Sequence, residues 1–393
     1  MTDTSQTVSP TADWHYPTAI RFGAGRIVEL PDACREAELD SPLLVTDQGL
    51  AELPMVTEAV AACRAVGLGC SLFGGIRSNP TLRNVEIGLA AFRAGNHDGV
   101  IAFGGGSALD AGKAIAFMAG QTLPIWDFED IGDNWRRADA DGIRPVIAVP
   151  TTAGTGSEVG RAAVVTDEDS RVKKVIFHPG MMPVAVIADP ALTTSLPPPV
   201  TAATGMDALA HALEAYCAPG YHPMADGIAL EAMRLVHDWL RTAVTNGADP
   251  AARANMMAAA GMGAVAFQKG LGAIHAVSHP LGALYDKHHG LLNAVIMPYV
   301  MAFNRPAIGP RLDRLGRYLG LATPGFDGVL DWVLALRRDI GIPHTLADIG
   351  IDDRDAQRIG DMAAVDPTAG GNPVPVDSAA LKGLFLDALA GRL

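Results

Sequence analysis

The 393-residue sequence predicts an α/β domain built on a parallel sheet, followed by an all-helical domain. Up to about residue 190, short apolar runs alternate with amphipathic helical patterns. A Pro-rich connector at 192–199 interrupts this alternation, and the rest of the chain has helical periodicity almost throughout. We therefore expect two domains, an α/β domain at 1–190 and a helical domain at 191–393.

The strands and helices of the first domain follow from its hydrophobic pattern. Strands buried on both faces of a parallel sheet read as short continuous apolar runs rather than as alternating ones. Such runs predict strands at 42–46, 69–73, 99–103, 144–149 and 184–188. Between the first four of these strands, the pattern predicts one helix in each interval, at 50–66, 81–94 and 108–118.

The second half of the chain is rich in Ala, Met and Leu at helical spacing, with no further strand pattern. Its predicted helices lie at 200–217, 224–243, 250–267, 275–284, 294–304, 311–319, 326–340, 353–363 and 378–390. Helices packed only against helices bury their apolar stripes in a bundle-like core. We therefore expect the second domain to be all-helical.

Composition excludes several classes of protein. Apolar residues form 49% of the chain and charged residues 19%, which is incompatible with intrinsic disorder. The net charge of −13 gives no global attraction to nucleic acid or to anionic membranes. The four cysteines form no CxxC pair, and no apolar run reaches the roughly 18 residues of a membrane span. The polar N-terminal stretch does not resemble a signal peptide, so we expect a cytoplasmic protein.

A glycine-rich loop, GGGSALDAGK at 104–113, directly follows the predicted strand at 99–103. A strand, a run of glycines and a helix present backbone N–H groups to a phosphate, and Ser107 can add a hydroxyl. The loop lacks the usual dinucleotide fingerprint because Leu109 stands where the third glycine would fall, and it lacks Walker A spacing. A ligand-free strand-to-helix turn remains the alternative.

Two further polar features lie at predicted strand ends. Asp47 can bind the adenosine ribose of NAD and repel the 2′-phosphate of NADP. It precedes the glycine loop instead of following it, so either the topology departs from the usual pattern or Asp47 is only a helix cap. The segment PTTAGTGSE at 150–158 places four hydroxyls after a strand, where α/β sheets bind ligands, although an ordinary Ser/Thr turn is also compatible.

Seven of the 11 histidines fall within 211–289. Asp207 and His211 are four residues apart, which places them about 40° apart on one helix face, and His275 and His279 repeat this spacing. His289 follows closely. One carboxylate and several imidazoles on rigid helices suit Fe²⁺ or Zn²⁺. Any one of these histidines alone would more commonly be a structural core or surface residue.

Together these motifs make the chain resemble the iron-containing (group III) alcohol dehydrogenase family over almost its whole length. The motifs that carry the resemblance are PTAIRFGAGR (17–26), VTDQGL (45–50), SNPT (78–81), GGGSALDAGK (104–113), PTTAGTGSE (150–158), DP (189–190), GMDALAHALEAY (205–216), GLGAIHAVSHPLGALYDKHHG (270–290) and GGNPVP (370–375). The resemblance implies a Rossmann-like N-terminal domain, an all-helical metal-binding domain of dehydroquinate synthase-like architecture, and a catalytic cleft between them.

The resemblance also implies a set of site residues. The metal ligands would be Asp207, His211, His275 and His289, the last chosen over His288 because it directly precedes a glycine. The coenzyme would lie along Asp47, Asn79, Gly105, Gly106, Ser107, Asp110, Thr151, Thr152, Thr155 and Lys173. His279 would lie near the metal and relay a proton. The expected cofactors are Fe²⁺, with Zn²⁺ as the second choice, and NAD rather than NADP.

The expected reaction is hydride transfer between a small primary alcohol, or a hydroxy acid, and its aldehyde or ketone. Related activities stay open: a dehydroquinate synthase-like or glycerol-phosphate dehydrogenase-like enzyme, a maleylacetate reductase-like enzyme, or a non-catalytic binding protein. Arg161 and Lys269 could bind a substrate carboxylate, although solvated surface charges are the common case. The resemblance further implies a homo-oligomer, a dimer or larger.

Overall fold

The structure is a computed structural model that describes residues 12–14, 18–170 and 172–393. Most of the polar N-terminal stretch discussed above lies outside the described residues, as does Pro17 at the start of its first motif. The chain divides into two compact units. The first runs up to Thr152 and includes Gly156–Ser195, and the second comprises Ala153–Thr155 and Leu196–Leu393.

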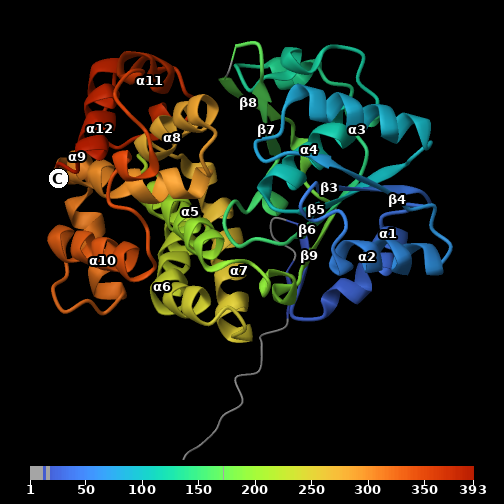
Figure 1. The fold of residues 1–393 in the computed structure, drawn as a ribbon, viewed down its shortest axis with the longest axis horizontal. Coiled ribbons are helices and arrows are strands. Elements are labelled where there is room, and N and C mark those ends of the chain that lie inside the picture. Colours follow the sequence, from blue (N-terminus) through green and yellow to red (C-terminus); the bar gives the residue numbers. More distant parts are fainter. Residues whose placement is uncertain (1–11, 15–17, 171) are drawn as a thin grey trace, which may run out of the picture. The chain divides into compact units, whose positions relative to one another are not determined.

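The first unit contains a sheet of seven described strands in the order β1-β2-β9-β6-β5-β3-β4 (Figure 1). All neighbours pair in parallel except β1 and β2. The strands are β1 (Ala12–Trp14), β2 (Ala19–Phe22), β3 (Pro42–Asp47), β4 (Ser71–Ile76), β5 (Gly99–Gly104), β6 (Val146–Pro150) and β9 (Ala185–Ala188). An antiparallel hairpin of β7 (Ala162–Asp167) and β8 (Val172–Phe177) lies outside this sheet.

Helices cover both faces of the parallel sheet. They are α1 (Leu30–Glu36), α2 (Pro54–Ala65), α3 (Leu82–Ala94) and α4 (Gly106–Met118). Ile101 and Phe103 of β5 share one apolar cluster with α1 and α2. The alternate residue Ala102 faces α4, where a Cβ on Gly112 would come within 2.7 Å of the Ala102 side chain. A strand with both faces covered must be apolar throughout, which is why β5 is buried at every position.

The strands predicted in this unit are all present, whereas β1, β2, β7 and β8 were not predicted. The helix predicted at 50–66 begins only at Pro54. Its expected first turn is a bend in which Asp47 Oδ1 accepts hydrogen bonds from the Gly49 and Leu50 N–H groups. These local bonds compete with helix formation, so the helix starts where Pro54 provides a favourable first position.

The second unit is helical, as predicted (Figure 1). Its helices are α5 (Pro198–Cys217), α6 (Pro223–Thr245), α7 (Pro250–Ala266), α8 (Ala273–Tyr285), α9 (His289–Tyr318), α10 (Phe326–Asp339), α11 (Ala356–Ala364) and α12 (Ser378–Ala390). Every residue of α5 from Thr201 to Cys217 is buried, which makes this helix the centre of the unit. The predicted fold class, an α/β domain followed by a helical domain, is confirmed.

One helix prediction in this unit was wrong. The two helices expected at 294–304 and 311–319 are parts of the single helix α9, which continues through Pro306 and Pro310. Proline removes a backbone hydrogen bond and is therefore unfavourable inside a helix. Burial of Ile308, Leu312 and Leu315 along one side of α9 outweighs this cost. Among the described residues, no helix is long and apolar enough to cross a membrane.

Candidate metal centre and coenzyme loop

Helix α5 presents three polar side chains on one buried face. Asp207, His211 and Glu214 follow at i, i+4 and i+7, which a helix brings within about 60° of one another. All three are buried. A Cβ on Gly263 of α7 would meet the Ala208 carbonyl oxygen at 3.1 Å, so α7 lies very close to this part of α5. Buried polar groups of this kind require partners.

Those partners come from α8 and α9. The Oδ1 atom of Asp207 lies 3.7 Å from His289 Nε2 and 4.0 Å from His275 Nε2. Gly290 makes this approach possible, because a Cβ there would collide with the Ala203 carbonyl oxygen of α5. The donor atoms of these three ligand candidates lie within 4.8 Å of one another. Two ligands of one ion at roughly 2.1 Å each can be at most about 4.2 Å apart, so the two distances from Asp207 fit a shared cation.

The fourth predicted ligand, His211, is adjacent but is not part of that three-residue group. Its Nε2 atom lies 4.0 Å from Asp207 Oδ1. The His211 ring stacks on the ring of His275, with their centroids 4.8 Å apart. The centroid of the Phe267 ring lies 5.1 Å from that of His211. Burial lowers the pKa of His211 to about 4, which favours the neutral imidazole that binds metals.

Glu214 fixes the orientation of His275. One carboxylate oxygen of Glu214 lies 2.6 Å from His275 Nδ1, and the other accepts the Ile274 N–H at 2.7 Å, in the first turn of α8. Burial acts to lower the pKa of His275, but the carboxylates of Glu214, Asp207 and Asp366 together outweigh it and the pKa is raised. In the neutral imidazole that binds a metal, Nδ1 donates to Glu214 and the lone pair of Nε2 points toward Asp207 and His289. A carboxylate behind a ligating histidine is a common support for metal sites.

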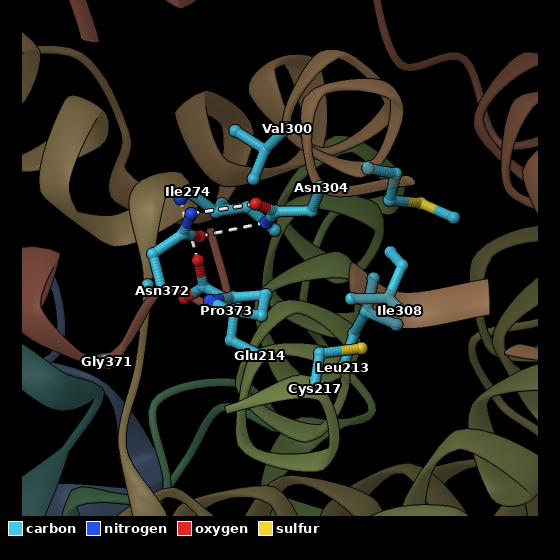
Figure 2. A pocket seen from close by; sticks show the side chains of 12 residues that line it. Leu213, Glu214, Cys217, Ile274, Val300, Asn304, Ile308, Gly371, Asn372 and Pro373 are labelled. Carbon is cyan, nitrogen blue, oxygen red and sulfur yellow. Dashed lines mark hydrogen bonds between the residues drawn. The ribbon is translucent and has the colours of Figure 1, made fainter. Parts of the chain in front are cut away.

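Behind Glu214 lies a small cavity (Figure 2). Its volume of about 20 Å³ has room for roughly one water molecule, so it is too small for an organic substrate. The amides of Asn304 and Asn372 hydrogen-bond to each other along its wall, and Asn372 Oδ1 also accepts the Ala273 N–H. This polar wall holds the beginning of α8, and therefore His275, in place.

His279 lies beside the three donors without joining them. Its ring stacks on the His289 ring with centroids 5.4 Å apart, and its Nδ1 atom lies 2.8 Å from Asp366 Oδ2. The other Asp366 oxygen accepts from the backbone and the hydroxyl of Thr368. Asp366 is thereby fixed and can hold His279 with Nδ1 protonated, leaving Nε2 free to exchange a proton.

The remaining charged candidates have other partners. Lys269 Nζ forms an ion pair with Asp226 at 2.6 Å, and its side chain is only 2% exposed. Arg161 lies over the Phe177 ring, 5.6 Å from the centroid. His288 is the residue that precedes α9. The ammonium of Lys269 is thus neutralised within the protein, which removes the support for a substrate-carboxylate role.

In the first unit, the glycine loop leads from β5 into α4. Gly104 has φ +145°, a conformation that other residues rarely adopt, and a Cβ there would lie 2.7 Å from the Ala108 side chain. Helix α4 then begins at Gly106 with no side-chain cap, so its first N–H groups can serve an external acceptor. A Cβ on Gly105 would press against Thr152 at 3.2 Å. The geometry therefore suits close approach of a phosphate.

Several predicted coenzyme residues gather near this loop. Lys173 Nζ donates to Asn79 Oδ1 at 2.7 Å, and the Asn79 N–H donates to the Ser107 hydroxyl at 3.3 Å. A Cβ on Gly104 would be 3.4 Å from Asp47 Oδ2, so this carboxylate lies at the entrance of the loop. Thr151 is buried and donates its N–H to Gly104, whereas Thr155 belongs to the short segment that packs with the helical unit.

Asp110 and Lys113 of α4 hydrogen-bond to the loop at 150–164. Asp110 accepts hydrogen bonds from the Ser157 hydroxyl at 2.5 Å and from the Val164 N–H at 3.0 Å. Lys113, with its side chain 2% exposed, lies 3.4 Å from Asp110 and donates to the carbonyls of Ser157, Gly160 and Ala162. Of the predicted coenzyme residues, Asp110 is thus committed to internal bonds.

Glu158 makes the stability of this unit dependent on pH. Burial raises the pKa of Glu158 to about 7, although Lys113 partly opposes the shift. The folded protein therefore retains a proton that the unfolded chain releases near pH 4.5. The associated stability is complete below about pH 4.5 and is lost as the pH rises through about 7.

We expect Glu158→Gln to stabilise the protein at pH 8 by up to about 3 kcal/mol and to have little effect at pH 4.5, because the amide needs no proton. Urea unfolding of both proteins across this pH range measures the difference. An equal effect at both pH values would contradict the assignment.

Three residues at the metal centre were not singled out in the sequence: Glu214, Asn293 and Asp366. Two of them had a detectable signal in the sequence. Glu214 follows Asp207 by seven residues, and Asn293 follows His289 by four, so each lies on the helix face of a predicted ligand. Asp366 is 87 residues from His279 and had no local signal. Only the packing of the chain brings it there.

Comparisons with known proteins agree with this geometry. Residues 17–190 match the family described as iron-containing alcohol dehydrogenase, and residues 201–389 match its C-terminal domain. The 4-hydroxybutyrate dehydrogenase of Cupriavidus necator is 38% identical, covering 93% of this chain and 96% of its own. A crystal structure of 1,3-propanediol oxidoreductase has a TM-score of 0.89 at 34% identity, covering 94% of this chain and 97% of its own. Sulfoacetaldehyde reductase of Bifidobacterium kashiwanohense, solved in complex with NAD⁺, has a TM-score of 0.85 at 29% identity, covering 97% and 98%.

Proposed function

The chain belongs to the iron-containing alcohol dehydrogenase family, and on that premise we propose that it uses NAD and a divalent metal to interconvert a small primary alcohol, or a hydroxy acid, and its aldehyde or ketone. The proposal assigns the coenzyme to residues 1–190 and the metal to residues 191–393. The observation that carries it is the approach of Asp207, His275 and His289 within one buried cluster.

The donor set fits a divalent ion of borderline hardness. One carboxylate oxygen and imidazole nitrogens suit Fe²⁺, which we propose as the bound ion, and also Zn²⁺ as the second choice. We assign Asp207, His211, His275 and His289 as the ligands. When bound, the ion supplies Lewis acidity that lowers the pKa of an alcohol hydroxyl.

The other side chains perform separate tasks. Glu214 keeps Nε2 of His275 directed at the cation position. His279, held at Nδ1 by Asp366, accepts the alcohol proton at Nε2 and returns it in the reverse direction. The glycine loop and Ser107 bind the coenzyme pyrophosphate, with Asn79, Thr151, Thr152, Thr155 and Lys173 as further contacts, while Asp110 orders the loop from behind.

The test of this function is the formation of NADH from a panel of primary alcohols, diols and hydroxy acids, followed at 340 nm with Fe²⁺ present. We expect turnover with at least one member of the panel, loss of turnover after chelation, and recovery on adding Fe²⁺. Full activity in a metal-stripped preparation would contradict the metal role. Coenzyme binding without net NADH formation would instead favour a lyase of the dehydroquinate synthase kind.

Coenzyme choice depends on Asp47 in this proposal. Its carboxylate would bind the adenosine ribose of NAD and repel the 2′-phosphate of NADP. We expect Asp47→Gly to raise the ratio of kcat/KM for NADP to that for NAD by at least about tenfold, because juxtaposed like charges are costly.

Asp47→Asn is the matched control, since the amide still accepts from the Gly49 and Leu50 N–H groups but carries no charge. If charge decides the preference, both variants relax it. If only Asp47→Gly relaxes it, the turn rather than the charge is responsible.

The cytoplasmic location and the homo-oligomeric state stay predictions.

A further inference from the structure

Asn293 lies over the three donor atoms of the metal centre. It is fully buried on α9, four residues after His289. Its Nδ2 atom lies 2.8 Å from Asp207 Oδ1, 3.1 Å from His275 Nε2 and 3.1 Å from His289 Nε2. A single amide nitrogen therefore contacts all three atoms of the candidate ligand group.

The chemistry of these contacts fixes the orientation of the amide. In neutral His275 the proton lies on Nδ1 beside Glu214, so the Nε2 atom is an acceptor, and the Asp207 carboxylate is an acceptor as well. Only the NH₂ end of Asn293 can face such acceptors. The Oδ1 atom of Asn293 is buried and has no hydrogen-bond partner among the described residues. Asn293 thus directs its NH₂ group at the three ligand candidates, while its own Oδ1 acceptor makes no hydrogen bond with the described residues.

A cation and this amide require the same lone pairs. A metal ion binds the Nε2 atoms of the histidines at about 2.0–2.1 Å through the lone pairs that point toward Asn293. Once those lone pairs are used, the two histidine contacts of Nδ2 are lost, and only the carboxylate of Asp207 retains a free lone pair for it. Metal uptake must therefore break contacts that Asn293 makes.

We propose that Asn293 is a positioning residue that holds the three donors together before the metal binds and competes with the metal for them. The inference rests on the metal site proposed above. Removal of the amide takes its Nδ2 contact from His275 Nε2 in the metal-free protein, whereas the metal has already replaced that contact in the loaded form. It therefore destabilises the metal-free form more than the loaded one. The affinity for the metal must then rise.

The experiment measures Co²⁺ affinity by competition with a chelator, together with thermal unfolding of metal-stripped and Co²⁺-loaded protein. We expect Asn293→Ala to tighten Co²⁺ binding about tenfold, and to lower the Tm of the stripped protein more than that of the loaded one. Asn293→Asp conserves the shape, cannot donate, and adds a charge beside Asp207. It should tighten Co²⁺ binding by more than Asn293→Ala does.

Asn255→Ala is the matched control, because Asn255 is a half-buried amide of the same unit whose Nδ2 atom donates to the Ala251 carbonyl and contacts no proposed ligand. It should lower the stability of both forms equally and leave the Co²⁺ affinity unchanged. Weaker or unchanged Co²⁺ binding in both Asn293 variants would overturn the inference, since Asn293 would then be a ligand or a packing residue. If the wild-type protein binds no Co²⁺, the proposed metal site itself fails.

Discussion

Asp207→Ala is expected to reduce alcohol oxidation at least about a thousandfold and to leave the purified protein without stoichiometric metal. Asp207 provides the only carboxylate oxygen in the three-donor group. Its Oδ1 atom lies 4.0 Å from the Nε2 atoms of His211 and His275 and 3.7 Å from that of His289. Loss of a metal that stabilises charge in the transition state costs several kcal/mol.

Metal content by atomic absorption, and kcat/KM with the best alcohol of the panel, measure this effect. NADH binding, followed by fluorescence, should be retained, because the coenzyme residues assigned to the first unit are untouched. Glu214→Gln is the graded control: its amide can still accept from His275 Nδ1 but carries no charge, so we expect a 10–100-fold loss of metal affinity or activity. An Asp207→Ala protein that turns over normally without metal would refute the assignment.

Lys113→Met is expected to destabilise the first unit by about 3–5 kcal/mol, the usual cost of removing one partner of a buried ion pair. The side chain is almost fully enclosed, and its ammonium holds Asp110 together with three carbonyls of the loop at 157–162. Methionine fills a similar volume but removes the positive charge beside the Asp110 carboxylate and the shared donor of the three carbonyls.

Urea denaturation gives the free energy of unfolding for this variant. Lys174→Met is the control in the same unit, because Lys174 forms ion pairs with Glu129 and Asp167 at a more exposed position. Such pairs contribute at most about 1 kcal/mol. Equal losses of free energy of unfolding in the two variants would show that the buried ion pair of Lys113 contributes no more than the exposed pairs of Lys174.

Coenzyme binding should weaken in Lys113→Met alone, because the loop that Lys113 supports adjoins Thr151 and Thr152.

The sequence determined what depends on neighbours along the chain. Apolar runs located the five strands at 42–46, 69–73, 99–103, 144–149 and 184–188, since a strand covered on both faces must be apolar at every position. Helical spacing of four residues placed Asp207 and His211 on one face of α5. The motif order identified the family. The glycine after His289 was part of that signal, and its physical role is to let α9 approach α5.

Only the tertiary structure decided the contacts between distant segments. It joined His279 to Asp366, oriented His275 through Glu214, and directed the amide of Asn293 at the donor atoms. It also paired Lys269 with Asp226 and continued α9 through Pro306 and Pro310. Backbone periodicity is a local property that a sequence displays directly, whereas the partner of a buried polar group is chosen by packing among residues that can be nearly a hundred positions apart.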